Sequence, residues 1–260
     1  MTATGASLLG RPLWYELMTS DAKAAEAFYA AVVGWTPAPF EGSPQPYTLF
    51  SRPGGTPVAG VLTTPGDVSA SPFWAMYVGV PSLEDAKAHI TRLGGGECSP
   101  VIDVPGIGRM QMMRDPQGAV FYIFQPSSTE QTPEGEPAIG EGSWHELMTT
   151  DAPAAMTFYQ DVFGWQPSEA MDMGGMGTYQ MFNRADRMIG GMMNKGPEMA
   201  EVPPNWQVYF RVPDIPSAVE RITANGGTII NGPMEVPGGD WIVNALDPQG
   251  AVFALHARKV

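Results

Sequence analysis

Apolar and polar residues alternate over short runs, and a segment with helical spacing follows the first of these runs. Residues 13–19 alternate as a strand does, and Asp21 behind them is a residue that favours the cap of a helix. Phe28 and Val32 continue at helical spacing, and Gly34 stands where a helix would end. The pattern therefore predicts a strand followed by one helix.

The rest of the chain repeats this order with further strands. Three strand-like runs follow the helix and are separated by Pro, Gly and Ser: 34–39, 47–52 and 57–63. The pattern restarts with a strand at 73–80, a helix from Ser82 to Gly94, and strands at 97–104, 109–114 and 119–125. The second half has helices at 151–163 and 214–224. We expect an α+β fold of four βαβββ motifs, whose curved mixed sheets carry helices on one face.

Two stretches of sequence occur twice. Residues 14–21, WYELMTSD, return as WHELMTTD at 144–151, and DPQGAVF at 115–121 returns unchanged at 247–253. A duplication of this regularity predicts two copies of one module. We place module 1 at residues 1–126 and module 2 at 144–260. Residues 127–143 between them are rich in Ser, Pro, Gly and Glu and are typical of a linker.

Composition and charge narrow the class of protein. Hydrophobic residues make up 43% of the 260, which supports folded cores, and the net charge is −13. The absence of any Lys/Arg cluster argues against nucleic acid, and the acidic balance argues against an anionic membrane. One cysteine allows no intrachain disulfide. No signal-like or long apolar segment is present, so we expect a cytoplasmic protein.

The first strand of each copy places a carboxylate between large apolar side chains. Leu17 and Leu147 suit the helix-covered face, so the opposite face carries the alternate residues: Trp14, Glu16 and Met18 in copy one, and Trp144, Glu146 and Met148 in copy two. A carboxylate in such surroundings is partly desolvated, which makes Glu16 and Glu146 candidate general bases. The alternative is that each Glu pairs with a neighbouring Arg or with backbone amides and only orders the sheet.

Later strands add further candidates on the same uncovered face. They are Tyr77 and Tyr122 in copy one, and Gln207, Tyr209, Arg211 and His256 in copy two. His145 should lie on the helix-covered face instead. His256 is either a hydrogen-bonded lining residue or a catalyst. Because the matching positions of copy one are Ala75, Gly79 and Phe124, copy two is the more polar of the two surfaces.

The repeated signatures, a strand followed by Asp, Phe-Tyr, Gly-Trp and then Asp-Pro-Gln-Gly, resemble the vicinal oxygen chelate superfamily over residues 12–255. This superfamily includes glyoxalase I, bleomycin-resistance proteins, fosfomycin-resistance enzymes and extradiol dioxygenases. The tandem layout resembles the two-module glyoxalase-like proteins of bacteria. The resemblance implies paired βαβββ motifs that form cupped sheets.

The resemblance also implies positions for a divalent metal. The first-strand ligand falls at Trp14 and Trp144, and the eighth-strand ligand at Tyr122 and Ala254. The fifth-strand position falls at Ala75 and Gln207, and the fourth strand offers no His or Glu. Such residues cannot supply a normal ligand set, so we expect no metal and no other cofactor. A displaced site that uses Glu16 or Glu146 stays open as an alternative.

The leading hypothesis is therefore a glyoxalase-like protein that binds a small apolar or aromatic molecule without metal. A second is a metal-independent lyase or isomerase, with Glu16 or Glu146 as base and Tyr77 or Tyr209 as hydrogen-bond donor. A divergent metal-dependent glyoxalase or dioxygenase and a protein-interaction module complete the alternatives. We expect a small-molecule ligand as partner and a monomer by default, with a dimer possible.

Overall fold

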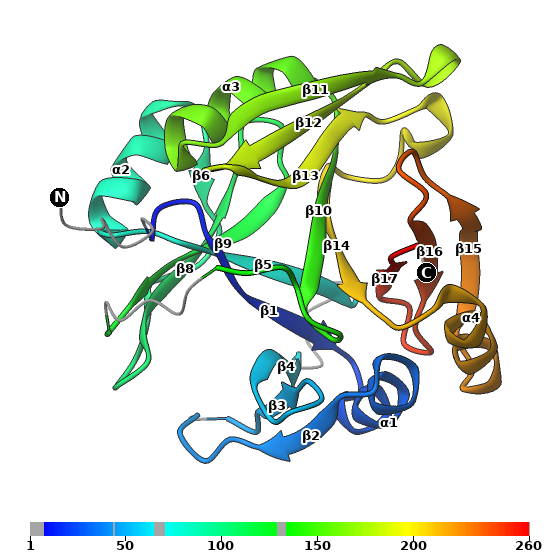
Figure 1. Cartoon of the computed structure of the whole chain (residues 1–260). Coiled ribbons are helices and arrows are strands. Elements are labelled where there is room, and N and C mark those ends of the chain that lie inside the picture. The colour runs from blue at the N-terminus through cyan, green and yellow to red at the C-terminus, as the bar shows by residue number, and fades with distance from the viewer. Residues whose placement is uncertain (1–7, 44, 65–70, 129–133, 260) are drawn as a thin grey trace, which may run out of the picture. The chain divides into compact units, whose positions relative to one another are not determined.

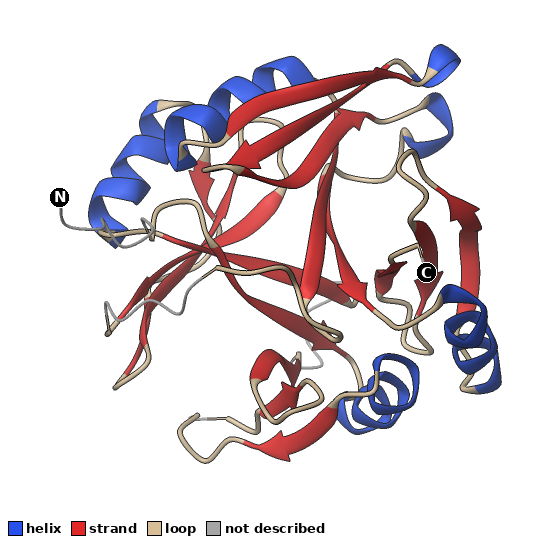
Figure 2. Ribbon diagram, in the orientation of Figure 1, coloured by secondary structure: helices blue, strands red, loops and turns tan. Residues whose placement is uncertain are grey.

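The computed structural model describes residues 8–43, 45–64, 71–128 and 134–259. Within these residues, curled strands dominate and four α-helices accompany them (Figures 1 and 2). The α+β class and the four βαβββ motifs agree with the prediction from the sequence. Residues 129–133 of the predicted linker lie outside the described residues.

The first two motifs belong to copy one. The first motif contains β1 (Pro12–Thr19), α1 (Ala22–Val33), β2 (Thr36–Pro39), β3 (Thr48–Ser51) and β4 (Pro57–Thr63). The second contains β5 (Phe73–Gly79), α2 (Leu83–Arg92), β6 (Gly96–Glu97), β7 (Ile102–Val104), β8 (Gly108–Arg114) and β9 (Val120–Pro126). The strand predicted at 97–104 is divided, because the Met112 amide donates to Ser99 Oγ in place of a backbone carbonyl.

The last two motifs belong to copy two. The third contains β10 (Gly142–Thr149), α3 (Ala152–Phe163), β11 (Gln166–Asp172), β12 (Thr178–Arg184) and β13 (Arg187–Asn194), with short 3-10 helices η1 (Gly174–Met176) and η2 (Pro197–Met199). The fourth contains β14 (Asn205–Arg211), α4 (Ile215–Ala224), β15 (Thr228–Glu235), β16 (Trp241–Leu246) and β17 (Val252–Ala257).

The predicted caps set the first helix of each copy. The Asp21 carboxylate accepts the Ala24 amide at 3.0 Å, and Gly34 ends α1 with a φ of 85°. Asp151 caps α3 in the same way, also at 3.0 Å. Only glycine adopts the left-handed conformation at the end of α1 without strain. The repeated sequence thus fixes where both helices begin and end.

Each motif forms one mixed section of sheet. The strand orders are β2-β3-β4-β1, β6-β8-β9-β5, β11-β12-β13-β10 and β15-β16-β17-β14. The pairs β1/β4, β5/β9, β10/β13 and β14/β17 are parallel, and the remaining neighbours in these orders are antiparallel. The mixed sheets therefore confirm the predicted fold class.

The chain folds into two compact units that exchange motifs between the copies. Compact unit 1 contains Met1–Leu13, Met76–Gly135 and His145–Trp206, and compact unit 2 contains Trp14–Ala75, Glu136–Trp144 and Gln207–Val260. Within unit 2, α1 packs on α4, and within unit 1, α2 packs on α3 (Figure 1). The sequence modules at 1–126 and 144–260 follow the repeat rather than this packing, and they stay a prediction.

The repeated motifs meet inside these cores. In unit 2, the hydroxyl of Tyr29 from copy one donates to Asp247 of copy two at 3.1 Å. In unit 1, the hydroxyl of Tyr159 from copy two donates to Asp115 of copy one at 3.0 Å. The other oxygen of Asp115 accepts the amides of residues 117, 118 and 119. Burial raises the pKa of both aspartates, although these hydrogen bonds oppose it. Phe-Tyr and Asp-Pro-Gln-Gly are thus core elements.

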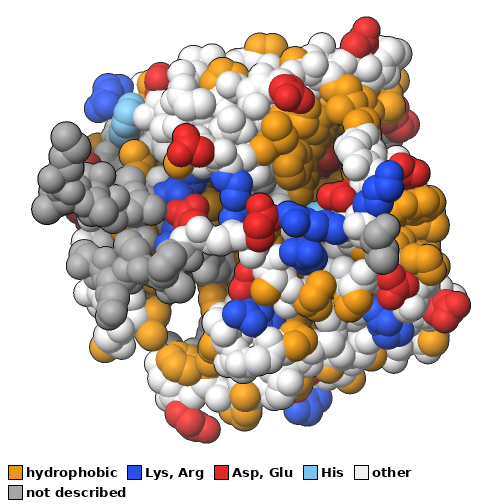
Figure 3. All heavy atoms as spheres, in the orientation of Figure 1, with side chains coloured by type: hydrophobic (Ala, Val, Ile, Leu, Met, Phe, Trp, Pro, Cys, Tyr) orange, Lys and Arg blue, Asp and Glu red, His pale blue; other side chains and the backbone are white. Residues whose placement is uncertain are grey.

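Two surface properties bear on function. Basic and acidic side chains lie interspersed over the face drawn in Figure 3. Among the described residues, no helix is both long and apolar enough to cross a membrane.

Candidate functional site

We call the sheet face opposite the helices the open face. On β14, Val208 and Phe210 are buried toward the helices, and Phe210 packs edge-on against Trp35. Gln207 and Tyr209 therefore project from the open face, because side chains alternate along a strand.

Tyr209 lies at one end of a row of open-face residues in copy two. The register aligns Tyr209 with Ala254 of β17, and Ala254 with Asn244 of β16. The short side chain of Ala254 leaves room above it, and the Asn244 amide nitrogen donates to the Tyr209 hydroxyl at 3.3 Å. Tyr209 and Asn244 are 3% and 7% exposed. This hydrogen bond therefore belongs to a buried floor.

The next row holds Arg211 opposite His256. His256 Nδ1 lies 2.9 Å from Ser143 Oγ, and Nε2 lies 2.9 Å from Asp240 Oδ2. Burial opposes ionisation of Asp240, but the hydrogen bonds from His256 and the Lys259 amide outweigh it and lower the Asp240 pKa.

The hydrogen bonds of the Ser143 hydroxyl limit the role that His256 can have. The hydroxyl also donates to the Tyr209 carbonyl at 3.0 Å. Because a carboxylate can only accept, His256 Nε2 donates to Asp240, while His256 Nδ1 faces the Ser143 hydroxyl, which has a single proton for Nδ1 and the Tyr209 carbonyl. With Nε2 on Asp240, both ring nitrogens are engaged. This arrangement favours the lining role of His256 over the catalytic one.

Three buried polar atoms on this part of the sheet lack a hydrogen-bond partner among the described residues. They are Gln207 Nε2, Arg211 Nε and Asn244 Oδ1. A buried polar atom that stays unpaired costs about 1–3 kcal/mol, so such atoms mark places for a polar group of a ligand or for water. The open face of β14 and β16 thus offers two donors and one acceptor.

The equivalent row in copy one is apolar. Tyr77 is aligned with Tyr122 of β9, and Tyr122 with Met112 of β8. The rings of Tyr77 and Tyr122 stack with centroids 4.2 Å apart and planes 1° from parallel. Phe124 meets Tyr77 edge-on at 6.4 Å. Both tyrosines are 4% exposed, whereas Met112 and Phe124 are half-buried. Aromatic rings form the floor here.

In copy two, Glu146 lies beside a glycine that a tyrosine covers. Glu146 is aligned with Gly191 of β13, and the ring of Tyr179 leaves no room for a Cβ at Gly191. The Tyr179 hydroxyl donates to Glu146 Oε2 at 3.0 Å. Glu146 is half-buried. Glycine is needed at this position because the tyrosine approaches the backbone closely.

Copy one repeats the arrangement. Glu16 is aligned with Gly60, and Tyr47 covers this glycine. Here the Trp14 indole N–H donates to the Tyr47 hydroxyl at 2.9 Å. Glu16 is 6% exposed, so it is more deeply buried than its counterpart in copy two. The other predicted first-strand residues, Met18, Trp144 and Met148, are half-buried.

His145 lies on the helix side, as predicted. It is 3% exposed, and its Nδ1–H donates to the Ile189 carbonyl, with nitrogen and oxygen 2.7 Å apart. Burial lowers the pKa of His145 to about 4, although the Ile189 carbonyl opposes this shift. The imidazole is therefore neutral at pH 7. Tyr15 holds the equivalent position in copy one and packs edge-on against Phe210.

Comparisons with known families match both copies. Residues 15–124 match a family described as a glyoxalase-like domain, and 143–255 match the glyoxalase/bleomycin resistance protein/dioxygenase superfamily. "Putative glyoxylase CFP32" of Mycobacterium tuberculosis is 30% identical over 252 residues, which cover 95% of this chain and 94% of the relative. The chain belongs to the glyoxalase/bleomycin resistance/dioxygenase superfamily.

Other superfamily members give the same picture. "Anthracycline biosynthesis protein DnrV" of Streptomyces peucetius is 31% identical over 264 residues, which cover 95% of this chain and 92% of that protein. The solved structure of a Mn(II)-bound glyoxalase from Novosphingobium aromaticivorans has a TM-score of 0.66 and 18% identity, and covers 96% of this chain and 82% of the other. The 2,3-dioxygenase LapB from Pseudomonas sp. KL28 has a TM-score of 0.67 and 13% identity, over 98% and 94%. Both structures share the superfamily fold.

The residues present do not fit the metal site that the superfamily implies. An indole nitrogen has no lone pair to offer a metal, and Trp14 directs its N–H to Tyr47. Ala254 has no donor atom, and Tyr122 is stacked on Tyr77. Among the described residues, no three His, Cys, Asp or Glu side chains gather as a metal would require. The superfamily's usual set of metal ligands is therefore absent from these positions.

Several residues of these surfaces were not predicted from the sequence. Tyr47 and Tyr179 carry a usable signal, because they occur at matching positions of the two copies, as do Gly60 and Gly191. The polar residues around His256 carry no such signal, because copy one has Leu13 where copy two has Ser143 and Met112 where it has Asn244. These residues become visible only through strand register.

Proposed function

We propose that this superfamily member binds a planar polycyclic aromatic molecule with hydroxyl or carbonyl groups, and that it does so without a metal. The supporting observation is the row of open-face side chains that includes the position of the superfamily's eighth-strand metal ligand. Tyr122 occupies this position in copy one and stacks on Tyr77, whereas in copy two Ala254 leaves it to the ring of Tyr209. Aromatic floors of this kind suit a flat ligand.

The buried polar atoms of copy two indicate which polar groups the edge of the ligand would carry. Gln207 Nε2 and Asn244 Oδ1 are buried without a partner among the described residues, and Gln207 is itself half-buried. Hydroxyl and carbonyl groups on a ring would satisfy such atoms. The relatives named for anthracycline biosynthesis make a ring system of that class a reasonable first ligand.

The test is equilibrium binding to the full chain after treatment with a chelator. A dihydroxyanthraquinone is titrated by calorimetry, and a naphthalene sulfonate serves as the probe for unspecific apolar binding. We expect saturable binding in the micromolar range, which corresponds to about −8 kcal/mol, and at least tenfold weaker binding of the sulfonate. Equal affinity for the two probes contradicts the proposal.

Variants assign the binding to the two surfaces. Tyr122→Ala removes one ring of the copy-one stack, and we expect it to weaken or remove the binding there. Tyr209→Phe keeps the ring and removes the hydroxyl that meets Asn244, so it should reduce the preference for the hydroxylated ligand. Leu147→Ile, on the helix side, is the control. Elemental analysis and native mass spectrometry complete the test, and stoichiometric Zn, Ni, Fe or Mn contradicts the metal-free proposal.

A second candidate function is a metal-independent lyase or isomerase with Glu146 as base. It is favoured by the hydrogen bond from Tyr179, which fixes one carboxylate oxygen and leaves the group half-buried. Glu146→Gln should then abolish turnover of a bound ligand and preserve its affinity. Glu16→Gln in copy one is the matched control, and equal losses in both variants would contradict a role specific to Glu146.

A further inference from the structure

Arg211 is the last residue of β14 and projects from the open face of copy two, on the same side of the strand as Gln207 and Tyr209. Its Nη1 donates to the Pro137 carbonyl. Its Nε is buried and has no hydrogen-bond partner among the described residues, although the side chain as a whole is half-buried. A guanidinium is a cation and only donates. Arg211 therefore places a positive charge and an unused donor at the end of the proposed binding surface.

The charge of Arg211 has no direct partner within the part of the chain that the structure describes. Three acidic residues adjoin the contacts of Arg211, and each pairs with another basic side chain: Glu136 with Arg258, Glu141 with Arg52, and Asp240 with His256. Both oxygens of Asp240 are engaged, because the second one accepts the Lys259 amide at 3.0 Å. Arg211 itself forms no ion pair with a described carboxylate. An acceptor with a negative charge is thus missing beside it.

The same end of the row is apolar in copy one. Three apolar residues there correspond to three polar residues of copy two: Leu13 to Ser143, Gly79 to Arg211, and Phe124 to His256. Leu8 and Leu13 fill the space above Gly79, because a Cβ at this glycine would lie 2.8 Å from a methyl group of each leucine. The two copies therefore differ at one place by three side chains, and all three are polar in copy two.

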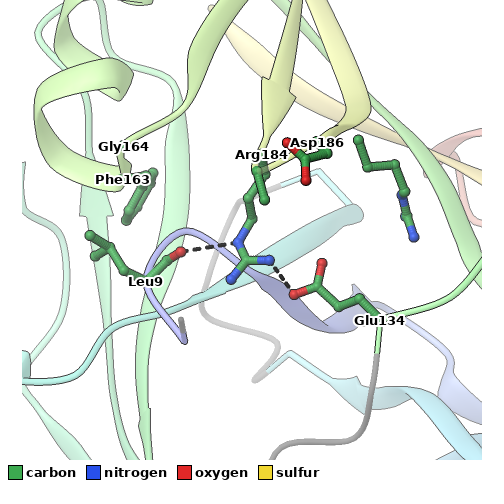
Figure 4. Close-up of a pocket in the computed structure, with 8 residues that line it drawn as sticks. Leu9, Glu134, Phe163, Gly164, Arg184 and Asp186 are labelled. Carbon is green, nitrogen blue, oxygen red and sulfur yellow. Dashed lines mark hydrogen bonds and ion pairs between the residues drawn. The ribbon is translucent and has the colours of Figure 1, made fainter. Parts of the chain in front are cut away.

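Arg184 in compact unit 1 illustrates an arginine whose partners come from the protein itself. Its Nε donates to the Leu9 carbonyl at 3.0 Å, and its Nη1 donates to Glu134 (Figure 4). Two arginines and two carboxylates line the cavity of about 490 Å³ drawn there. Arg211 has neither an acceptor at Nε nor a carboxylate among the described residues. Since an unpaired buried donor is unfavourable, this position is suited to an acceptor from a ligand.

We propose that the ligand of copy two carries a carboxylate and that Arg211 binds this group, an inference that rests on the proposed function. The Nε edge of a guanidinium presents two parallel N–H groups, which match the two oxygens of a carboxylate. A single arginine also matches a single negative charge. Side chains two positions apart on a strand are about 7 Å apart, so a fused-ring ligand over Tyr209 can place a substituent at Arg211. Arg211 thus determines which polycyclic molecules copy two prefers.

The experiment compares a dihydroxyanthraquinone that carries one carboxylate with its primary amide. The two probes share their rings and differ in the charge of one substituent. Each is titrated by calorimetry into the chelator-treated full chain with Tyr122→Ala, which weakens the contribution of copy one. We expect the carboxylate to bind at least about tenfold more tightly than the amide. A naphthalene sulfonate is also an anion, but its rings carry no oxygen for Asn244, so its binding stays weak.

Variants of two arginines assign the preference. Arg211→Gln should reduce it to less than about twofold, because the new side chain is neutral. Arg211→Lys keeps the charge without the two parallel N–H groups, so it should retain a preference of about threefold. The matched control is Arg221→Gln: Arg221 is half-buried on α4, on the helix side, where its Nε donates to the Val32 carbonyl. This control should keep the full preference, and thermal melts check that each variant is folded.

The inference and the proposed function fail in different ways. Saturable binding of both probes with equal affinity overturns the role of Arg211 and leaves the binding of a polycyclic ligand in place. If neither probe shows saturable binding, both proposals are overturned. The role of Arg211 is also overturned if the preference for the carboxylate persists in Arg211→Gln, or if Arg221→Gln loses it to the same extent.

Discussion

The open faces of the two copies differ although their strands pair in the same way. In copy one the row Tyr77, Tyr122 and Met112 is an apolar floor with two stacked rings. In copy two the same row is Tyr209, Ala254 and Asn244, and a hydrogen bond crosses it.

The exchange of Tyr122 for Ala254 accounts for most of this difference. A second ring fills the space in copy one, whereas the small residue in copy two lets Tyr209 approach Asn244. The duplication therefore preserved the backbone and the core, and changed what the surfaces can bind.

The largest expected effect is on the free energy of unfolding. It tests whether the cores around Asp115 and Asp247 are equivalent. Asp115→Ala and Asp247→Ala each remove a buried carboxylate that accepts backbone amides and a tyrosine hydroxyl. We expect each variant to lose about 3 kcal/mol or more of the free energy of unfolding, because several buried groups lose their partner. Urea unfolding followed by circular dichroism measures this loss. If one variant loses much less than the other, the cores differ and the comparison is not confined to the open faces.

The second largest expected effect is the pH dependence of stability caused by His145, and copy one has Tyr15 in place of this histidine. The folded pKa of His145, about 4, lies below the ordinary value of 6.5. Between these values the unfolded chain binds a proton that the folded chain does not, so stability falls as the pH falls from 6.5 to 4. The loss at pH 4 is about 3 kcal/mol, given 1.36 kcal/mol per pKa unit.

The variant His145→Asn isolates this contribution. Asparagine can still donate to the Ile189 carbonyl but does not titrate. Unfolding measured at pH 7.5 and at pH 4 should show the wild type losing about 3 kcal/mol more than the variant over this range. Parallel losses in both proteins would exclude His145 as the cause. The raised pKa values of Asp115 and Asp247 act in the opposite direction in both proteins and cancel in the difference.

These surfaces also show how much of the structure can be predicted from the sequence alone. Asp21, Gly34 and the alternation in the first strand were sufficient to predict the strand, the helix and its caps, because each depends on local chemistry. The Asp-Pro-Gln-Gly repeat was a reliable sign of the superfamily, but its partner could not be predicted. Tyr29 meets Asp247, 218 positions away and in the other copy. Such pairing depends on how the motifs exchange, which the repeat does not encode.

A direct conversion of copy two into copy one is expected to have a moderate effect. Ala254→Tyr places a second ring beside Tyr209, as Tyr122 stands beside Tyr77, and displaces the hydrogen bond to Asn244. We expect the preference for the dihydroxyanthraquinone over the naphthalene sulfonate to fall about tenfold in copy two, which is about 1.4 kcal/mol. Calorimetric titration in a Tyr122→Ala background measures copy two with the contribution of copy one weakened or removed. An unchanged preference would show that the polar row does not select the ligand.

The smallest expected effect separates the hydrogen bond from the ring. Asn244→Met introduces the residue that copy one has at this position, Met112, and leaves Ala254 and Tyr209 in place. One neutral hydrogen bond contributes about 0.5–1.5 kcal/mol, so we expect a threefold to tenfold weaker binding of the hydroxylated ligand and little change for the sulfonate. If both probes weaken equally, Asn244 supports the shape of the floor and not its polarity. If the loss in Ala254→Tyr exceeds the loss in Asn244→Met, the added ring contributes beyond the lost bond, and the space above Ala254 is itself part of what distinguishes the two copies.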